Sequence, residues 1–568
     1  MNLSISALHA AYRSGELSPR DLVAQLLVKI QGHENHNAWI SVLTLEQLEP
    51  CLARLATESP DTLPLFGVPF AIKDNIDLAG VATTAACEAY GYVPEHSATV
   101  VERLVAAGAI PLGKTNLDQF ATGLVGTRSP FGIVKNSFDP HWISGGSSSG
   151  SAVAGGLGEG SFALGTGTDG SGRGPAAFNN LLGIQPSLGR WSCHGLVPAC
   201  KTLDCPTIFT LQVDDAQRIG SVLDGIDERD PFSRERPPLA GNTVTPVVGV
   251  PSAEQLRFFD DGAYQQAFNA ARSTAEELGW ELREIDFSPF AEAAELLYAG
   301  PWVAERLHTV RDLLASDPDA LLPVIRTIIE PAAKDTAVAA FDAQYQLAAL
   351  AVKARRVLAE VDALLLPTTG GQFRIDQVEQ EPVARNSELG WYTNFMNLLD
   401  MAAVAVPAGF VDNGLPFGVT LCAAAGTDQY LLQLAARWLG RGDVSVGACG
   451  HRHPDVSVLP ERGHIPVAVC GAHLQGMPLN PQLTERGATL LQCTQTAPSY
   501  RFYALAGGPP YRPGLVRDEA AGKAIDVEVW AVPAQHFGSF VAGIPAPLGI
   551  GKLELADGEW VSGFICEP

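Results

Sequence analysis

Two short segments rich in glycine and serine constrain this chain more than any other feature. The first runs from Gly145 to Ser151 (GGSSSGS), and the second runs from Thr168 to Arg173 (TDGSGR). Small residues let the backbone approach a substrate closely and point its N–H groups at it. A flexible linker has a similar composition. The first segment, however, continues at once into Ala152-Val153-Ala154, which predicts the start of a buried helix. We therefore interpret both segments as parts of one active site.

A lysine at the end of an apolar run supplies a candidate base. The run from Leu65 to Ile72 predicts a buried strand that carries Lys73 into an apolar interior, where burial disfavours the ammonium form. A neutral lysine can activate a serine hydroxyl, which is a weak nucleophile without a base, and a second serine can relay the proton. The alternative is a lysine that extends its ammonium group to water. We expect a nucleophilic hydrolase that needs no histidine.

These three segments resemble the amidase signature family and, more narrowly, the allophanate hydrolases, over nearly the whole chain. The resemblance implies an α/β fold with a mixed sheet flanked by helices. It also implies a Ser–cis-Ser–Lys triad in which Ser171 is the nucleophile, Ser147 the relay and Lys73 the base. It implies no cofactor and no metal.

The stretch from Gly165 to Ser171, which overlaps the second segment, departs from the family pattern at two positions. The family reads Gly-Thr-Asp-Thr-Ala-Gly-Ser, whereas this chain has Gly167 in place of the aspartate and Asp169 in place of the small residue. By resemblance, the oxyanion hole consists of the backbone N–H groups of Thr168, Asp169, Gly170 and Ser171. A carboxylate at position 169 would then lie near a developing negative charge, at a cost in energy. We favour the interpretation that the chain keeps the amidase reaction despite these two changes. The alternative is a catalytically impaired protein that keeps only the fold.

A tyrosine and an arginine eight positions apart are the candidate substrate ligands. By resemblance, Tyr298 and Arg306 hold the carboxylate and amide of allophanate, and Gly123 borders the same pocket. A guanidinium matches a carboxylate with two parallel hydrogen bonds. The alternative is a surface arginine paired with Glu305 or Asp312. We expect hydrolysis of allophanate (urea-1-carboxylate) to ammonia and carbon dioxide through an acyl-enzyme; another small amide, such as a biuret-like compound, is the alternative substrate.

Composition excludes several other classes of partner. The formal net charge is −24 without a basic cluster, which argues against nucleic acid and anionic membranes. The sequence has neither a run of 18 apolar residues nor the basic-then-apolar start of a signal peptide. Its ten cysteines are scattered through apolar surroundings, as is typical of thiols in a reducing cytosol. We expect a cytoplasmic protein that acts on a small molecule.

Two groups of residues with metal-binding side chains lack the spacing of a metal site. Cys193, Cys200 and Cys205 are spaced too loosely for a zinc site. His451 and His453 form a pair, but a second pair of ligands is missing. We expect no metal.

The chain divides into an amidase signature domain (1–440), a linker rich in Gly, His, Asp and Pro (441–464) and a C-terminal domain (465–568). Residues 1–60 are predicted to be helical, with a helix that starts at Ser18-Pro19. Strands are predicted at 363–367, 402–408, 467–470, 501–505, 527–532 and 560–565, and a helix at 428–439.

The C-terminal part resembles the small α/β domain of allophanate hydrolases, with a fold like that of gamma-glutamyl cyclotransferases. In that family the domain is proposed to decarboxylate N-carboxycarbamate, and His473 is the matching acid/base. A turn histidine without a chemical role is the alternative, and so is a purely structural domain. The resemblance also implies a homodimer and an upstream enzyme such as a urea carboxylase.

Overall fold

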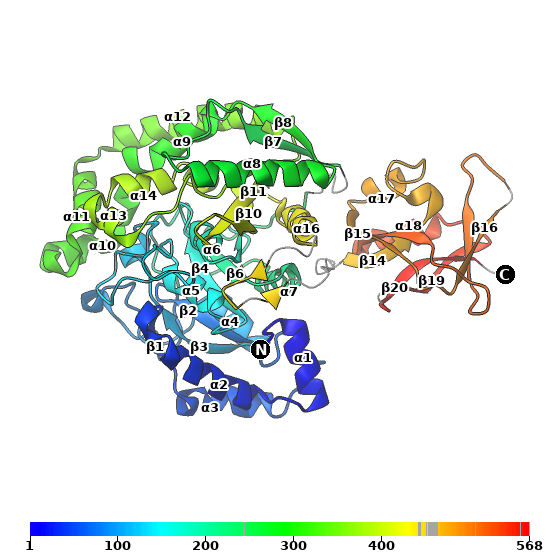
Figure 1. Ribbon diagram of the computed structural model, residues 1–568, viewed down its shortest axis with the longest axis horizontal. Coiled ribbons are helices and arrows are strands. Elements are labelled where there is room, and N and C mark those ends of the chain that lie inside the picture. The colour runs from blue at the N-terminus through cyan, green and yellow to red at the C-terminus, as the bar shows by residue number, and fades with distance from the viewer. Residues whose placement is uncertain are drawn as a thin grey trace. The chain divides into compact units, whose positions relative to one another are not determined.

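The computed structural model describes residues 1–239, 241, 245–440, 445–449, 451–452, 464–505, 507–556 and 558–566. The chain forms two compact units (Figure 1). The larger unit takes Met1–Pro237 and Val244–Val456, and the smaller takes Pro238–Thr243 and Ser457–Pro568. Within the described ranges, none of the helices has both the length and the apolar character needed to cross a membrane.

A mixed sheet of eleven strands organises the larger unit. Strands β2, β3 and β4 are parallel to one another, as are β7, β8 and β9, whereas the strands between these groups are antiparallel. The α/β class with a mixed sheet is therefore confirmed. In spatial order the strands are β1 (Trp39–Val42), β3 (Ile110–Thr115), β2 (Pro69–Lys73), β4 (Phe162–Gly167), β6 (Cys205–Thr210), β5 (Leu182–Gln185), β10 (Met401–Phe410), β11 (Pro416–Ala424), β9 (Ala363–Pro367), β7 (Val247–Pro251) and β8 (Glu281–Ile285).

Helices flank this sheet (Figure 1). They are α1 (Ile5–Ser14), α2 (Pro19–Gly32), α3 (Leu45–Leu55), α4 (Thr99–Ala106), α5 (Ser149–Gly156), α6 (Gly174–Phe178), α7 (Val213–Leu223), α8 (Gly262–Glu277), α9 (Ser288–Ala299), α10 (Val303–Ser316), α11 (Pro323–Ile329), α12 (Ala337–Leu358), α13 (Ile375–Gln380), α14 (Ala384–Leu389), α15 (Phe395–Leu398) and α16 (Asp428–Leu439). A short hairpin lies within the predicted linker. Its two strands, β12 (Ser445–Val446) and β13 (His451–Arg452), have two residues each.

The predicted start of α2 is confirmed, because Ser18 caps the helix by accepting the N–H of Asp21 at 3.2 Å. The prediction that residues 1–60 are all helical is wrong at one place. Trp39–Val42 forms β1, an edge strand of the main sheet that pairs with β3. Its aromatic and β-branched residues suit a strand better than a helix.

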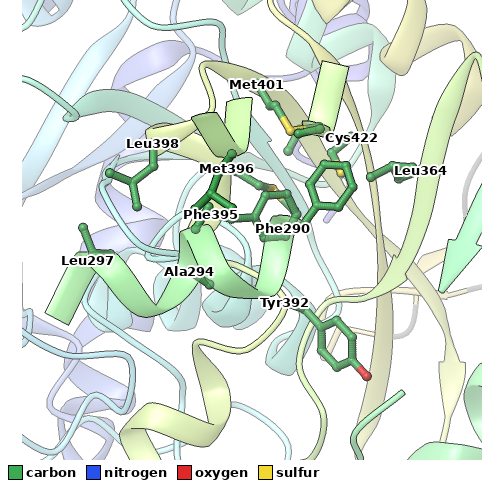
Figure 2. Packing of buried hydrophobic residues seen from close by; sticks show 14 of the residues in the cluster. Phe290, Ala294, Leu297, Leu364, Tyr392, Phe395, Met396, Leu398, Met401 and Cys422 are labelled. Carbon is green, nitrogen blue, oxygen red and sulfur yellow. The ribbon is translucent and has the colours of Figure 1, made fainter. Parts of the chain in front are cut away.

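A buried cluster fixes α9 against the sheet. Figure 2 shows Phe290, Ala294 and Leu297, which share one face of this helix, beside residues of α15 and of the strands. The rings of Phe290 and Phe395 meet edge to face, with centroids 5.3 Å apart. Burying each such side chain stabilises the fold by roughly 1.5–3 kcal/mol. The cluster therefore holds the C-terminal end of α9, where Tyr298 follows Leu297.

The smaller unit is built on a five-stranded sheet in the order β15-β18-β14-β20-β19, with a separate hairpin of β16 and β17. Strands at all four predicted places are present, and β15, β17 and β19 are additional. The elements are β14 (His464–Val469), α17 (Pro481–Thr484), β15 (Thr489–Gln495), β16 (Tyr500–Ala504), β17 (Pro513–Arg517), β18 (Asp526–Pro533), α18 (Ala534–Ala542), β19 (Leu548–Glu554) and β20 (Trp560–Cys566).

Candidate active site

Lys73 is the last residue of β2, a strand that is buried throughout, as the apolar run predicts. Its side chain is fully buried, and Nζ donates to Ser147 Oγ and to Thr166 Oγ1, both at 2.7 Å. The alternative of an ammonium group that reaches water is therefore wrong. Burial lowers the pKa of Lys73 to about 7, although Asp169 and two other acidic residues act in the opposite direction. A substantial fraction of Lys73 is thus neutral near pH 7 and able to accept a proton.

Ser147 lies directly between this lysine and the second segment. Its peptide bond to Gly146 is cis, as the resemblance implies. The Ser147 hydroxyl donates to Ser171 Oγ at 2.9 Å, which continues the chain of hydrogen bonds from Lys73. The helix α5 starts at Ser149, and a side chain at Gly150 would collide with the carbonyl oxygen of Ala38. The glycines of this segment therefore serve close packing rather than flexibility.

Ser171 is almost completely buried on the turn between β4 and α6. Gly170 has φ +134°, and a Cβ there would lie 2.5 Å from Thr393 Oγ1, so that only glycine fits. The Thr168 hydroxyl donates to Asp204, which also accepts the N–H of Ala199 at 2.8 Å. These contacts fix the conformation of the turn. The turn that carries Ser171 is therefore held in one conformation.

The side chain of Asp169 turns toward the predicted substrate ligands. Its Oδ1 accepts the hydroxyl of Ser171 at 2.8 Å. Its Oδ2 accepts the hydroxyl of Tyr298 and the Arg306 Nη2 group, the latter at 3.1 Å. Asp169 has no solvent exposure. The carboxylate thus joins the candidate nucleophile to the candidate substrate ligands.

Arg306 lies inside the protein rather than on its surface. The side chain is 2% exposed, and Glu305 contacts Thr202 instead, so the alternative of a surface ion pair is wrong. Arg306 Nη2 donates to the Tyr298 hydroxyl at 3.2 Å, and the guanidinium lies over the Tyr298 ring at 5.1 Å. The structure therefore brings these two residues together on the side of Asp169 away from Lys73.

The loop that contains Gly123 borders this arginine. Arg306 Nη1 donates to the carbonyl of Ala121 and the hydroxyl of Thr122, both at 3.1 Å. Asp118 organises the loop by accepting the N–H groups of residues 125, 126 and 128. A Cβ at Gly123 would lie 2.7 Å from Asp118 Oδ2, so the position requires glycine.

Sequence reasoning missed three residues at this site: Thr166, Asp118 and Asp204. Thr166 lies in the stretch that departs from the family pattern, and strand alternation could not have indicated it, because Ile72 pairs with Leu164 and alternation from that pair assigns Lys73 and Thr166 to opposite faces of the sheet. Asp118 and Asp204 act through backbone N–H groups of their own loops. Asp118 accepts N–H groups seven to ten positions later, and Asp204 accepts those of Ala199 and Cys200, four to five positions earlier. Neither contact has the two-residue spacing of an Asx-turn, so no local pattern indicates them.

His473 belongs to the smaller unit. It is buried, its Nε2 lies 3.1 Å from Gln482 Oε1, and its ring stacks on Phe564 with centroids 4.8 Å apart. Burial lowers its pKa. His453 of the histidine pair lies outside the described residues.

Two family models match the chain. One, described as Amidase, matches residues 21–432. The other, described as Allophanate hydrolase C-terminal domain, matches residues 465–568.

Individual relatives agree with both models. A urea amidolyase of Saccharomyces cerevisiae is 44% identical over 550 residues, which are 94% of this chain and 30% of that protein. A urea amidolyase of Lachancea kluyveri is 43% identical over 93% of this chain and 30% of that protein. The chain thus spans about a third of the length of these relatives. The solved structure of an allophanate hydrolase of Kluyveromyces lactis has a TM-score of 0.82 at 40% identity and covers 99% of this chain and 95% of its own.

Proposed function

Because the chain belongs to the amidase family and its last hundred residues match an allophanate hydrolase domain, we propose that it hydrolyses allophanate to ammonia and carbon dioxide. The observation that carries this proposal is the continuous hydrogen-bond chain Lys73–Ser147–Ser171, which ends beside a buried arginine. The chain of hydroxyls supplies an activated nucleophile, and Arg306 supplies an anchor for an anionic amide.

In the proposed mechanism, neutral Lys73 accepts a proton from Ser147 while Ser147 accepts that of Ser171. Ser171 Oγ then attacks the terminal amide carbonyl of allophanate. Backbone N–H groups at residues 168–171 stabilise the oxyanion, commonly the largest electrostatic contribution in acyl transfer. The proton returns through Ser147 to the leaving nitrogen, and ammonia departs. Water then attacks the acyl-enzyme and releases N-carboxycarbamate.

The decisive experiment measures ammonia release from fresh allophanate by the purified protein, with Ser171→Ala as the blank. Release that depends on Ser171 supports the proposal, and Lys73→Ala should abolish it as well. If the folded wild-type protein releases no ammonia, the proposed reaction is excluded.

A second candidate, hydrolysis of a small uncharged amide such as a biuret-like compound, is favoured by one observation. Asp169 already neutralises Arg306, which lowers the attraction of Arg306 for a second carboxylate. The two candidates are separated by the ratio of kcat/KM for allophanate to that for biuret. An impaired protein is the third interpretation, which stoichiometric labelling of Ser171 by a serine-reactive probe would exclude.

For the C-terminal domain we propose decarboxylation of N-carboxycarbamate with His473 as acid/base. Its neutral, buried imidazole next to Gln482 supports this role. In His473→Asn, carbon dioxide release should lag behind ammonia release. If the variant releases carbon dioxide as promptly after ammonia as the wild-type protein does, His473 has only a packing role.

We also propose a cytoplasmic enzyme that acts downstream of one that carboxylates urea, such as a urea carboxylase, since allophanate is urea-1-carboxylate. All ten cysteines are described and none is in a disulfide, which supports a reducing compartment.

A homodimer is proposed as well. One side of α12 carries four exposed apolar side chains, 43–70% exposed: Val338, Phe341, Tyr345 and Val352. This apolar stripe supports self-association. Light scattering of wild type and of Phe341→Glu/Tyr345→Glu tests it, because the double variant should be monomeric.

A further inference from the structure

The carboxylate of Asp169 occupies a position suited to the carboxylate of an anionic substrate. Tyr298 and Arg306 both donate to its Oδ2, and Asp169 itself is fully buried. A bound substrate carboxylate would require these same donors. The site is therefore already filled by the protein's own carboxylate.

A second observation indicates that this arrangement is incomplete without a ligand. Arg306 Nε is buried and has no hydrogen-bond partner among the described residues. A buried donor without a partner costs free energy. Nε and Nη2 together form one edge of the guanidinium, the edge that binds a carboxylate with two parallel bonds, whereas Asp169 contacts only Nη2. A ligand carboxylate on this edge would satisfy Nε as well.

We propose that Asp169 is a specificity-determining residue that competes with the substrate carboxylate for Arg306, so that an anionic amide binds only by displacing it. The proposal rests on the proposed function. The exchange has a second effect: because Asp169 Oδ1 also accepts the Ser171 hydroxyl, a displaced Asp169 releases that hydroxyl toward Ser147. Anion binding and activation of the nucleophile are thereby coupled, and a neutral amide does not trigger the exchange.

The test measures binding rather than turnover. Malonamate has CH2 in place of the NH of allophanate and carries the same carboxylate and terminal amide. Its affinity is measured by titration calorimetry for Ser171→Ala and for Ser171→Ala/Asp169→Ala, with uncharged malonamide as a second ligand. If Asp169 occupies Arg306 for at least nine-tenths of the time, removing the Asp169 carboxylate should tighten malonamate binding by about tenfold or more. The affinity for malonamide should increase by less than about threefold.

Asp204→Asn in the same Ser171→Ala background is the matched control. It removes a buried negative charge from the same site without touching Arg306. If Asp204→Asn increases malonamate affinity as much as Asp169→Ala does, the gain comes from the loss of any negative charge in the site and not from competition for Arg306. That result would overturn the proposal. So would an unchanged or weaker affinity in the Asp169 variant.

Asp169→Asn replaces Asp169→Ala if circular dichroism shows that the alanine variant does not fold, because the amide retains an acceptor for Tyr298. Its malonamate affinity should also exceed that of the parent. Loss of the proposed function is a separate result: it appears as absent ammonia release in the wild-type protein, whereas these affinities remain measurable.

Discussion

Replacing Asp169 with asparagine should shift the pH dependence of the reaction to lower pH. Lys73 must be neutral to act as the base, so activity rises with pH through the pKa of Lys73, which is about 7. The negative charge of Asp169 raises that pKa. Its removal must therefore lower the pKa and extend activity into more acidic solution.

The size of this shift follows from the geometry. Three hydrogen bonds of 2.7, 2.9 and 2.8 Å connect Lys73 Nζ to Asp169 Oδ1 through the two serines, so the charges are at most about 8 Å apart. At an effective dielectric constant of about 20, two unit charges at that distance interact with about 2 kcal/mol. Since one pH unit corresponds to about 1.4 kcal/mol, the acidic limb should move down by about one and a half pH units or more.

The assay is direct determination of ammonium released from fresh allophanate between pH 5 and 9. The value to compare is the acidic limb of kcat/KM, because this ratio reports ionisations of the free enzyme, in which Asp169 occupies its resting position. Asp215→Asn is the control: Asp215 is a buried aspartate on α7 that accepts the N–H of Ile5. The assignment of Lys73 as the base would be refuted if the acidic limb of the kcat/KM profile does not move in Asp169→Asn, or if it moves equally in Asp215→Asn.

Three further predictions concern the same unit. Arg306→Ala should raise KM for allophanate by a larger factor than it lowers kcat, because the substitution removes the anchor for the substrate carboxylate. An unchanged KM in steady-state kinetics would contradict the role of Arg306 as this anchor. Gly167→Asp combined with Asp169→Ala should raise kcat/KM, because the Asp169 carboxylate no longer holds the Ser171 hydroxyl and Arg306, although a Cβ at position 167 would lie 2.9 Å from Thr207 Cγ2 and that methyl group must shift; lower activity would mean that Asp169 has gained an essential role. Glu159→Gln should raise the melting temperature more at pH 9 than at pH 5. Burial raises the pKa of Glu159 from its ordinary value of 4.5 to about 8, so the stability contributed by the protonated form is lost as pH rises between these two values; equal effects at pH 5 and pH 9 would contradict this.

The proposed triad residues Lys73, Ser147 and Ser171 could be picked out from the sequence because each sits in a short segment with strong local constraints, whereas their roles follow from the resemblance. The apolar run before Lys73 predicts a buried strand, and the glycines around Ser147 and Ser171 mark close backbone approach. The predicted strand at 363–367 is a continuous apolar run, and the predicted helix at 428–439 combines apolar residues with interspersed polar ones; the structure has both elements.

The orientation of Asp169 could not be predicted. Its direction depends on Tyr298 and Arg306, which lie on α9 and α10 and reach the turn only through the packing of α9 on the sheet. The short strand at Trp39–Val42 was missed for a related reason: its four residues become a strand by pairing with β3, a contact that no local pattern reports.

The order of strands in the main sheet has a consequence for folding. β2 pairs in parallel with β4, so Lys73 meets Thr166 and Ser147 only after a long stretch of chain has closed on itself. Contacts between residues distant in sequence form slowly, whereas helices form early. During refolding, the helical circular dichroism signal should therefore recover before the amidase activity. Recovered activity would mark the moment at which the two strands have paired.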